Sequence, residues 1–166
     1  MNDQELRVVA QKFKVDFPLY AKNVLRVVTK DGELVPFKLN QAQKLVHAKL
    51  DQQLKETGKV RALVLKARQV GISTYIEGRL FWRTTQTRNA NAFVLSHLAE
   101  STNSIFQMVS TFYDNVPHKA FQPSLTSRSA QTLLFQDINS RYRVGTARSA
   151  QTGRSQTNRF VHGSEV

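Results

Sequence analysis

The stretch LVLKARQVGIST, residues 63–74, decides the fold of this chain. Its apolar start predicts a buried strand over 61–67, and Ser73-Thr74 open a predicted helix over 73–87. Where a strand leads into a helix through a short loop, backbone N–H groups and the helix N-terminus converge on anionic oxygens. The stretch therefore predicts a phosphate-binding loop.

The loop matches only half of the standard pattern G-x-x-x-x-G-K-[ST]. Gly71 and Ser73 are in register with it, whereas Lys66 replaces the first glycine and Ile72 replaces the lysine. Lys66 and Arg68 still supply positive charge, from the other end of the loop. An ordinary strand–turn–helix with a chance Gly-x-Ser and two surface cations is the alternative interpretation.

In a working loop each of these residue types has a defined role. Gly71 lets the backbone approach the phosphates, and Lys66 and Arg68 are candidates to stabilise phosphate charge. Ser73 is the candidate Mg²⁺ ligand, and Thr74 is a candidate α-phosphate contact.

A second motif, Phe160-Val161-His162-Gly163-Ser164-Glu165, lies about 90 residues further on. An apolar strand that ends in an acid suits a Walker B strand, whose carboxylate polarises the attacking water. Ser164 stands where an aspartate is usual and is a candidate to hold a Mg²⁺-bound water. An edge strand with a solvated Glu165 remains the alternative.

A third motif, PFKLNQAQ at 36–43, precedes the loop. A glutamine at a helix start is able to read adenine through its amide while an aromatic ring stacks on the base, which makes Gln43 and Phe37 candidates. Asn40 and Gln43 also form a capping box for a helix over about 41–57, closed by Gly58. Both roles are compatible with the sequence.

The remaining pattern alternates strands and helices, which predicts an α/β sheet with crossovers. The predicted helices cover 4–14 and 98–113 in addition to those named above. The predicted strands are 24–29, 33–37, 91–96, 131–136, 141–145 and 159–162, with Lys30-Asp31-Gly32 as a hairpin turn between the first two.

The charge points to a polyanionic partner. The 166 residues include 24 Lys and Arg against 12 Asp and Glu, a net charge of +12. Arginines dominate between 128 and 159, and they favour bidentate contacts with phosphate. We therefore favour a nucleic acid or nucleotide partner over the alternative that the protein is merely soluble and basic.

Composition also excludes several classes of protein. There is no cysteine, so disulfides and thiolate metal sites are ruled out. The four histidines lack metal-ligand spacing, the serines lack a nucleophile elbow, and no apolar run approaches the roughly 20 residues of a membrane span.

Together, the segments PFKLNQAQ, LVLKARQVGIST, FVLSHLAESTNSIFQ and RVGTARSAQTGRSQTNRFVHGSEV resemble the ATPase domain of the large terminase subunit, the DNA-packaging motor of tailed bacteriophages. The resemblance spans most of residues 33–166. Terminases are known for a phosphate loop with a displaced cation, so Ile72 fits the family. A Ser-Glu ending in place of the usual Walker B pair also fits.

The resemblance implies a P-loop NTPase of the ASCE type, with a mainly parallel sheet flanked by helices. It divides the chain into an N-terminal helix and hairpin start at 1–32 and a partial ATPase domain at 33–166. The family's coupling motif and RNase H-like nuclease domain are not present, so the sheet is expected to be incomplete at the C-terminus.

The resemblance also implies the site. Its catalytic residues are Glu165, Lys66, Arg68 and Arg154, the last as an arginine finger given to a neighbouring subunit. Ser73 would bind Mg²⁺, with Ser164 acting through water. The ATP-binding residues are Phe37, Gln43, Lys66, Ala67, Arg68, Gln69, Val70, Gly71, Ile72, Ser73 and Thr74.

The implied function is Mg²⁺- and ATP-dependent packaging of double-stranded DNA into the procapsid. The partners would be the portal protein, the small terminase subunit and further copies of the chain in a ring, at the procapsid portal in the host cytoplasm and without a membrane. Two alternatives remain: a helicase-like ATPase, and a basic DNA-binding or assembly module with an inactive nucleotide site.

Overall fold

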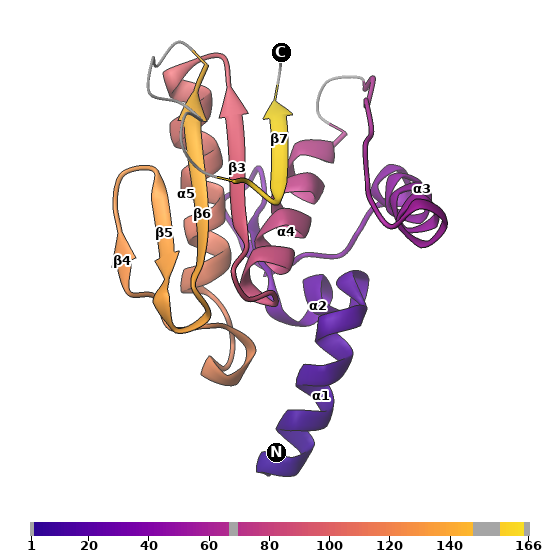
Figure 1. Ribbon diagram of the computed structural model, residues 1–166, viewed down its shortest axis with the longest axis vertical. Helices are drawn as coiled ribbons and strands as arrows, with labels where there is room; N and C mark the ends of the chain where they lie inside the picture. The colour runs from indigo at the N-terminus through magenta and orange to yellow at the C-terminus, as the bar shows by residue number, and fades with distance from the viewer. Residues whose placement is uncertain (1, 67–69, 148–156, 165–166) are drawn as a thin grey trace.

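A five-stranded mixed sheet forms the centre of the computed structural model, which describes residues 2–66, 70–147 and 157–164. The strand order is β4-β5-β6-β3-β7 (Figure 1). β6, β3 and β7 run parallel, whereas β4, β5 and β6 pair antiparallel. The strands are β3 (Asn91–Ser96), β4 (Ser127–Arg128), β5 (Thr132–Phe135), β6 (Ser140–Thr146) and β7 (Phe160–Ser164).

Two helices pack on one face of this sheet, α4 (Ile72–Thr85) and α5 (Ala99–Asp114) (Figure 1). Their apolar faces bury against the alternate strand residues that point the same way, as the period-2 alternation of a half-covered strand requires. Short 3₁₀ turns at Lys119–Phe121 and Gln136–Ile138 connect the later elements. The shared core is aromatic-rich and includes Phe81, Phe112, Phe135, Tyr142 and Val144.

The N-terminal part packs against the same helices. It comprises α1 (Asp3–Val15), α2 (Phe17–Val24), the hairpin strands β1 (Arg26–Val28) and β2 (Leu34–Pro36), and α3 (Gln41–Thr57). α1 extends away from the sheet (Figure 1), and its C-terminal end is tied down by the Trp82 indole, which donates to the Phe13 carbonyl at 2.6 Å. Phe13, Phe17 and Tyr20 join the main core.

Most local predictions are confirmed. The helix predicted at 41–57 is α3, with Asn40 and Gln43 as a capping box and Gly58 at φ 72°. The strand predicted at 91–96 is β3. The sequence did not reveal α2, which begins at an Asp16 N-cap and occupies residues expected to lead into a strand.

The strand predicted over 61–67 is wrong for the residues that the structure describes, 61–66, which are irregular. Leu63 and Leu65 are fully exposed, at 101% each. The apolar pattern does predict a strand, but a strand needs a hydrogen-bonded neighbour. β7 pairs with β3 and, within the described ranges, with no other strand, and a groove of about 700 Å³ separates it from this segment.

The expectation of a mainly parallel sheet is correct only in part. The parallel arrangement holds for β6, β3 and β7, and the hairpin edge β4-β5 makes the sheet mixed. The division of the chain at residue 32 stays a prediction. In the described part of the chain, no helix is long and apolar enough to cross a membrane.

Gly78 gives a test of how tightly α4 is packed. A Cβ at Gly78 would lie 3.2 Å from Phe37 Cε1 and 3.3 Å from Leu25 Cδ1. Helix propensity alone would make Gly78→Ala stabilising by about 1 kcal/mol, but overpacking a dense core costs about 1–3 kcal/mol. We therefore expect urea denaturation to show a lower free energy of unfolding for Gly78→Ala.

Ala48→Gly, on the exposed side of α3, measures the effect of helix propensity without core packing. It should lower the free energy of unfolding by about 1 kcal/mol. A Gly78→Ala protein more stable than the wild type would mean that the aromatic neighbours move aside, contrary to the packing described here.

Candidate functional site

The N-terminus of α4 has no side-chain hydrogen-bond cap among the described residues. Gly71 is the N-cap and adopts φ 73°, a left-handed conformation that favours glycine. The N–H groups of the first turn of a helix have no intrahelical partners and carry the positive end of the helix dipole. This end of α4 is therefore suited to bind an anion, with Ser73 and Thr74 half-buried in the first turn.

The start of α3 clamps the loop in front of this helix. The Gln43 side-chain amide donates to the Gly71 carbonyl at 2.7 Å, and the Asn40 side-chain amide donates to the Val70 carbonyl at 3.2 Å. The side-chain oxygens of the same two residues form the capping box: Gln43 Oε1 accepts from the Asn40 N–H, and Asn40 Oδ1 accepts from the Gln43 N–H, each at 2.9 Å. A Cβ on Gly71 would lie 2.9 Å from Gln43 Nε2, so only glycine fits there without displacing the clamp.

Both sequence interpretations of Gln43 omitted this contact with the loop. The capping role is confirmed, and the side chain is 3% exposed with both its amide nitrogen and its oxygen hydrogen-bonded. The adenine-reading role stays a prediction. No sequence signal would have revealed the contact, because it joins residues 28 positions apart.

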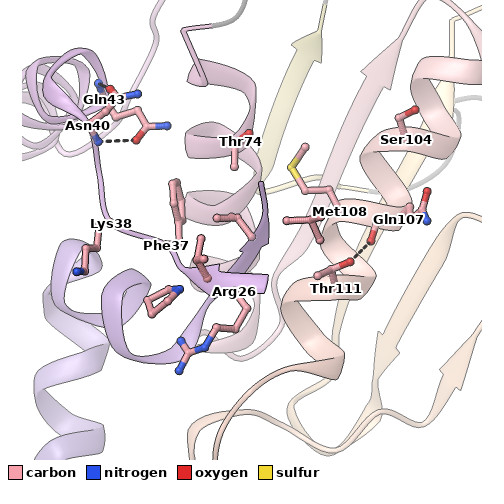
Figure 2. A pocket seen from close by; sticks show the side chains of 14 residues that line it. Arg26, Phe37, Lys38, Asn40, Gln43, Thr74, Ser104, Gln107, Met108 and Thr111 are labelled. Atoms are coloured by element: carbon pink, nitrogen blue, oxygen red, sulfur yellow. Dashed lines mark hydrogen bonds between the residues drawn. The ribbon is translucent and has the colours of Figure 1, made fainter. Parts of the chain in front are cut away.

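A cavity of about 590 Å³ lies beside the clamp, between the β1–β2 hairpin and α5 (Figure 2). Asn40, Gln43 and Thr74 line its side nearest the loop, and Ser104 and Gln107 line it from α5. Phe37 also lines it, but this ring is 3% exposed and stacks on Phe112 with ring centroids 6.4 Å apart. A stacking role for Phe37 toward a base stays a prediction.

Some residues of the predicted phosphate loop, and the predicted catalytic acid and arginine finger, lie outside the residues that the structure describes. In the loop, Lys66 is described and exposed, Ile72 is buried, and Ala67, Arg68 and Gln69 lie outside the description. Glu165 and Arg154 also lie outside it. Their predicted roles are not tested by the geometry.

A row of hydroxyl side chains crosses the carboxyl end of the parallel strands. Ser96 on β3 is in register with Thr146 on β6 and Ser164 on β7. Ser96 is 1% exposed, and its Oγ has no hydrogen-bond partner among the described residues. Ligands of α/β sheets bind at this edge, and polar residues at the ends of predicted strands were a signal that the sequence already contained.

A polar cluster ties α3 to α4 behind the clamp. His47 Nδ1 lies 2.8 Å from Arg79 Nη1 and 3.1 Å from the Tyr75 hydroxyl, and Arg79 Nη2 lies 2.7 Å from Asp51 Oδ1. Arginine only donates, so Nδ1 accepts and the imidazole is neutral with its proton on Nε2, 3.3 Å from Asp51 Oδ2. Burial lowers the pKa of His47, and Arg79 adds to this while Asp51 opposes it.

A hydroxyl beside a helix N-terminus is compatible with Mg²⁺ that is bound together with nucleotide phosphates. Mg²⁺ in nucleotide sites is held largely by substrate phosphates, waters and one or two protein oxygens. Ser73 in the first turn of α4 supplies such an oxygen beside the anion-binding helix end. In the part of the chain that is described, no group of three or more His, Asp or Glu side chains suits a metal.

Comparison with known proteins identifies the fold. No protein-family model matches the chain, and no curated protein matches its sequence. The crystal structure of the HK97 bacteriophage large terminase superposes with a TM-score of 0.72 over 90% of this chain, at 14% sequence identity. This chain has the fold of a phage large terminase. It spans 30% of the length of that terminase.

In this chain α4 and β7 pack side by side. α4 begins at the predicted phosphate loop, and β7 ends beside the predicted Walker B acid. The HK97 structure shares the fold at low identity, so the roles of individual residues rest on the geometry and the sequence motifs of this chain.

The lowered pKa of His47 predicts a pH dependence of stability. The folded state resists protonation of His47, so below about pH 6.5 the unfolded state binds more protons. The contribution of His47 to stability is therefore present above its unfolded pKa and is lost as the pH falls through the folded one. An NMR titration of the His47 Cε1 proton should give a midpoint below the usual value.

His47→Gln should flatten the dependence of the urea midpoint on pH in this range. A His47 midpoint above the usual value would contradict the assignment, since it would mean that Asp51 outweighs burial and Arg79.

Proposed function

We propose that this chain is the ATPase part of a terminase large subunit, which couples Mg²⁺-dependent ATP hydrolysis to the packaging of double-stranded DNA into a procapsid. The observation that supports this most directly is the Gly71 N-cap of α4, held by Gln43 within a terminase fold. The clamp holds the first turn of α4, whose N–H groups have no intrahelical partners, at one place, as phosphate binding requires.

The phosphate loop would act mainly through its backbone. Gly71 leaves room for the phosphates, and the N–H groups of Ser73 and Thr74 point out of the first turn of α4. Lys66 and Arg68 would stabilise charge on the transferring phosphate. The full set of proposed ATP contacts is Phe37, Gln43, Lys66, Ala67, Arg68, Gln69, Val70, Gly71, Ile72, Ser73 and Thr74.

Hydrolysis would depend on the end of β7. Glu165 would accept a proton from the attacking water and align it with the terminal phosphate. When bound, Mg²⁺ supplies charge neutralisation on the β- and γ-phosphates. Ser73 and, through water, Ser164 would hold the ion, and Arg154 would reach the site of a neighbouring subunit.

The positive charge of the chain supports contact with DNA. The net charge of +12 on 166 residues favours sequence-independent binding to the phosphate backbone. Such binding suits a motor that moves along any sequence. The portal protein, the small terminase subunit and a ring of copies at the procapsid in the host cytoplasm complete the proposed assembly.

Isothermal titration with Mg·ATP tests the phosphate loop. Lys66→Ala and Arg68→Ala should each weaken binding by about 1.5–3 kcal/mol, the value of a charge-assisted hydrogen bond, which is tenfold or more in Kd. Lys59→Ala, an exposed lysine of the same segment outside the loop, is the matched control and should bind as the wild type does.

Unchanged binding in both loop variants would rule out this loop as the phosphate site. A folded wild-type protein that binds no Mg·ATP would favour the non-enzymatic DNA-binding alternative. Strand separation by a longer chain that contains this domain would instead favour a helicase-like ATPase.

DNA binding should fall steeply with salt and vary little with sequence, because phosphate contacts release counterions. Fluorescence anisotropy of two duplexes of equal length and different sequence, each at low and at physiological salt, measures both properties. Strong preference for one duplex would contradict backbone-dominated binding.

A further inference from the structure

A fully buried carboxylate connects the phosphate-loop helix to the strand that leads to the predicted catalytic acid. Glu77 on α4 is 0% exposed. Its Oε1 lies 2.7 Å from His162 Nδ1 on β7, and its Oε2 accepts a hydrogen bond from the Tyr142 hydroxyl on β6. One side chain thus contacts two strands, β6 and β7, that lie on either side of β3.

Stability alone does not account for this trio. Removing a carboxylate from water is costly, and well-packed apolar residues of similar volume often replace buried ionic groups without loss of stability. The best-attested use of such groups is to specify one arrangement among several that pack similarly. In this protein, the arrangement that such a group would select is the register of β7 against β3.

Few contacts besides Glu77 set the register of β7: Phe160 packs against the core, and Asn91 bonds to Thr157 and Arg159 just before the strand. β7 is a five-residue strand that pairs with β3 and with no other strand in the described ranges. Its outer residues Val161 and Gly163 are exposed, and Phe160 is the one apolar residue among the described residues of its inner face. A slip of one residue would turn His162 to the outer face, and a slip of two would place Phe160 or Ser164 opposite Glu77.

The same contact sets a distance that the proposed reaction needs. Glu77 follows Ser73 by one helical turn and so lies on the same face of α4. His162 precedes Ser164, the last residue of β7, by two residues, about 7 Å along a strand, and both lie on the same face of it. The pair therefore relates the first turn of α4 to the end of β7.

We propose that Glu77 is a positioning residue that holds β7 in register through His162, and so fixes the end of β7 at Ser164 relative to the first turn of α4. The register part of this inference rests on the described contacts alone. Its consequence for hydrolysis rests on the proposed function.

The apolar variant Glu77→Leu/His162→Leu/Tyr142→Phe removes all three polar partners together. We expect it to unfold at a urea midpoint close to that of the wild type. NMR should then show several sets of signals for residues 160–164 and loss of the single β3–β7 pairing in which Val94 lies beside His162. Where the protein hydrolyses ATP, kcat should fall by about 100-fold, as expected for a displaced catalytic group, with KM nearly unchanged.

Thr84→Val is the matched control. Thr84 is also buried on α4, but its hydroxyl donates to the Leu80 carbonyl of its own helix. This variant should keep one register and the wild-type kcat. Glu77→Gln keeps the length and an acceptor oxygen, and should retain more of both properties than the apolar variant.

A single native register in the apolar variant would overturn the proposal, whether or not the wild type hydrolyses ATP. A lost register with wild-type kcat would overturn its link to catalysis while leaving the phosphate loop intact. Should the apolar variant not fold, His162→Leu alone removes the contact from the half-buried partner and gives the same two readouts.

Discussion

The hydrogen bond from the Gln43 side chain to the Gly71 carbonyl is the contact on which the rest of the candidate site depends. It joins the first turn of α3 to the residue that begins α4, and it requires glycine at that position because a Cβ would lie 2.9 Å from the amide nitrogen. Together with the Asn40 bond to the Val70 carbonyl, it holds the left-handed Gly71 in front of the helix. The direction of the α4 N-terminus, and hence of its N–H groups, follows from it.

The sheet supplies the second half of the site by topology. Parallel β6, β3 and β7 end at the same edge, which brings Ser96, Thr146 and Ser164 into one row. Glu77 then links that layer to α4 from within the core. Two constraints, one in front of α4 and one behind it, therefore fix the first turn of α4 relative to the end of β7.

Much of this could be predicted from the sequence, because local signals dominate the elements involved. Asn40, Gln43 and Gly58 define both ends of α3, and the apolar run at 91–96 defines β3. The segment 61–66 shows the limit of such reasoning. Its alternation is compatible with a strand, but pairing depends on neighbours that no local pattern specifies.

Contacts between residues far apart in the chain also could not be predicted from the sequence. Glu77 and His162 are 85 residues apart, and neither belongs to a motif that requires the other. An acid within the apolar face of a predicted helix was the one available sign. The bond from Gln43 to the loop could not be predicted for the same reason. Its capping partner Asn40 is local in sequence, whereas its loop partner Gly71 is not.

The central claim is that nucleotide phosphates bind where the clamp holds α4. An amide NMR titration of the isotope-labelled protein with Mg·ATP tests it most directly. The account predicts that the largest shifts fall on the backbone amides of 70–75 and on the side-chain amide of Gln43. Shifts confined to the β1–β2 hairpin and α5, with 70–75 unchanged, would contradict it.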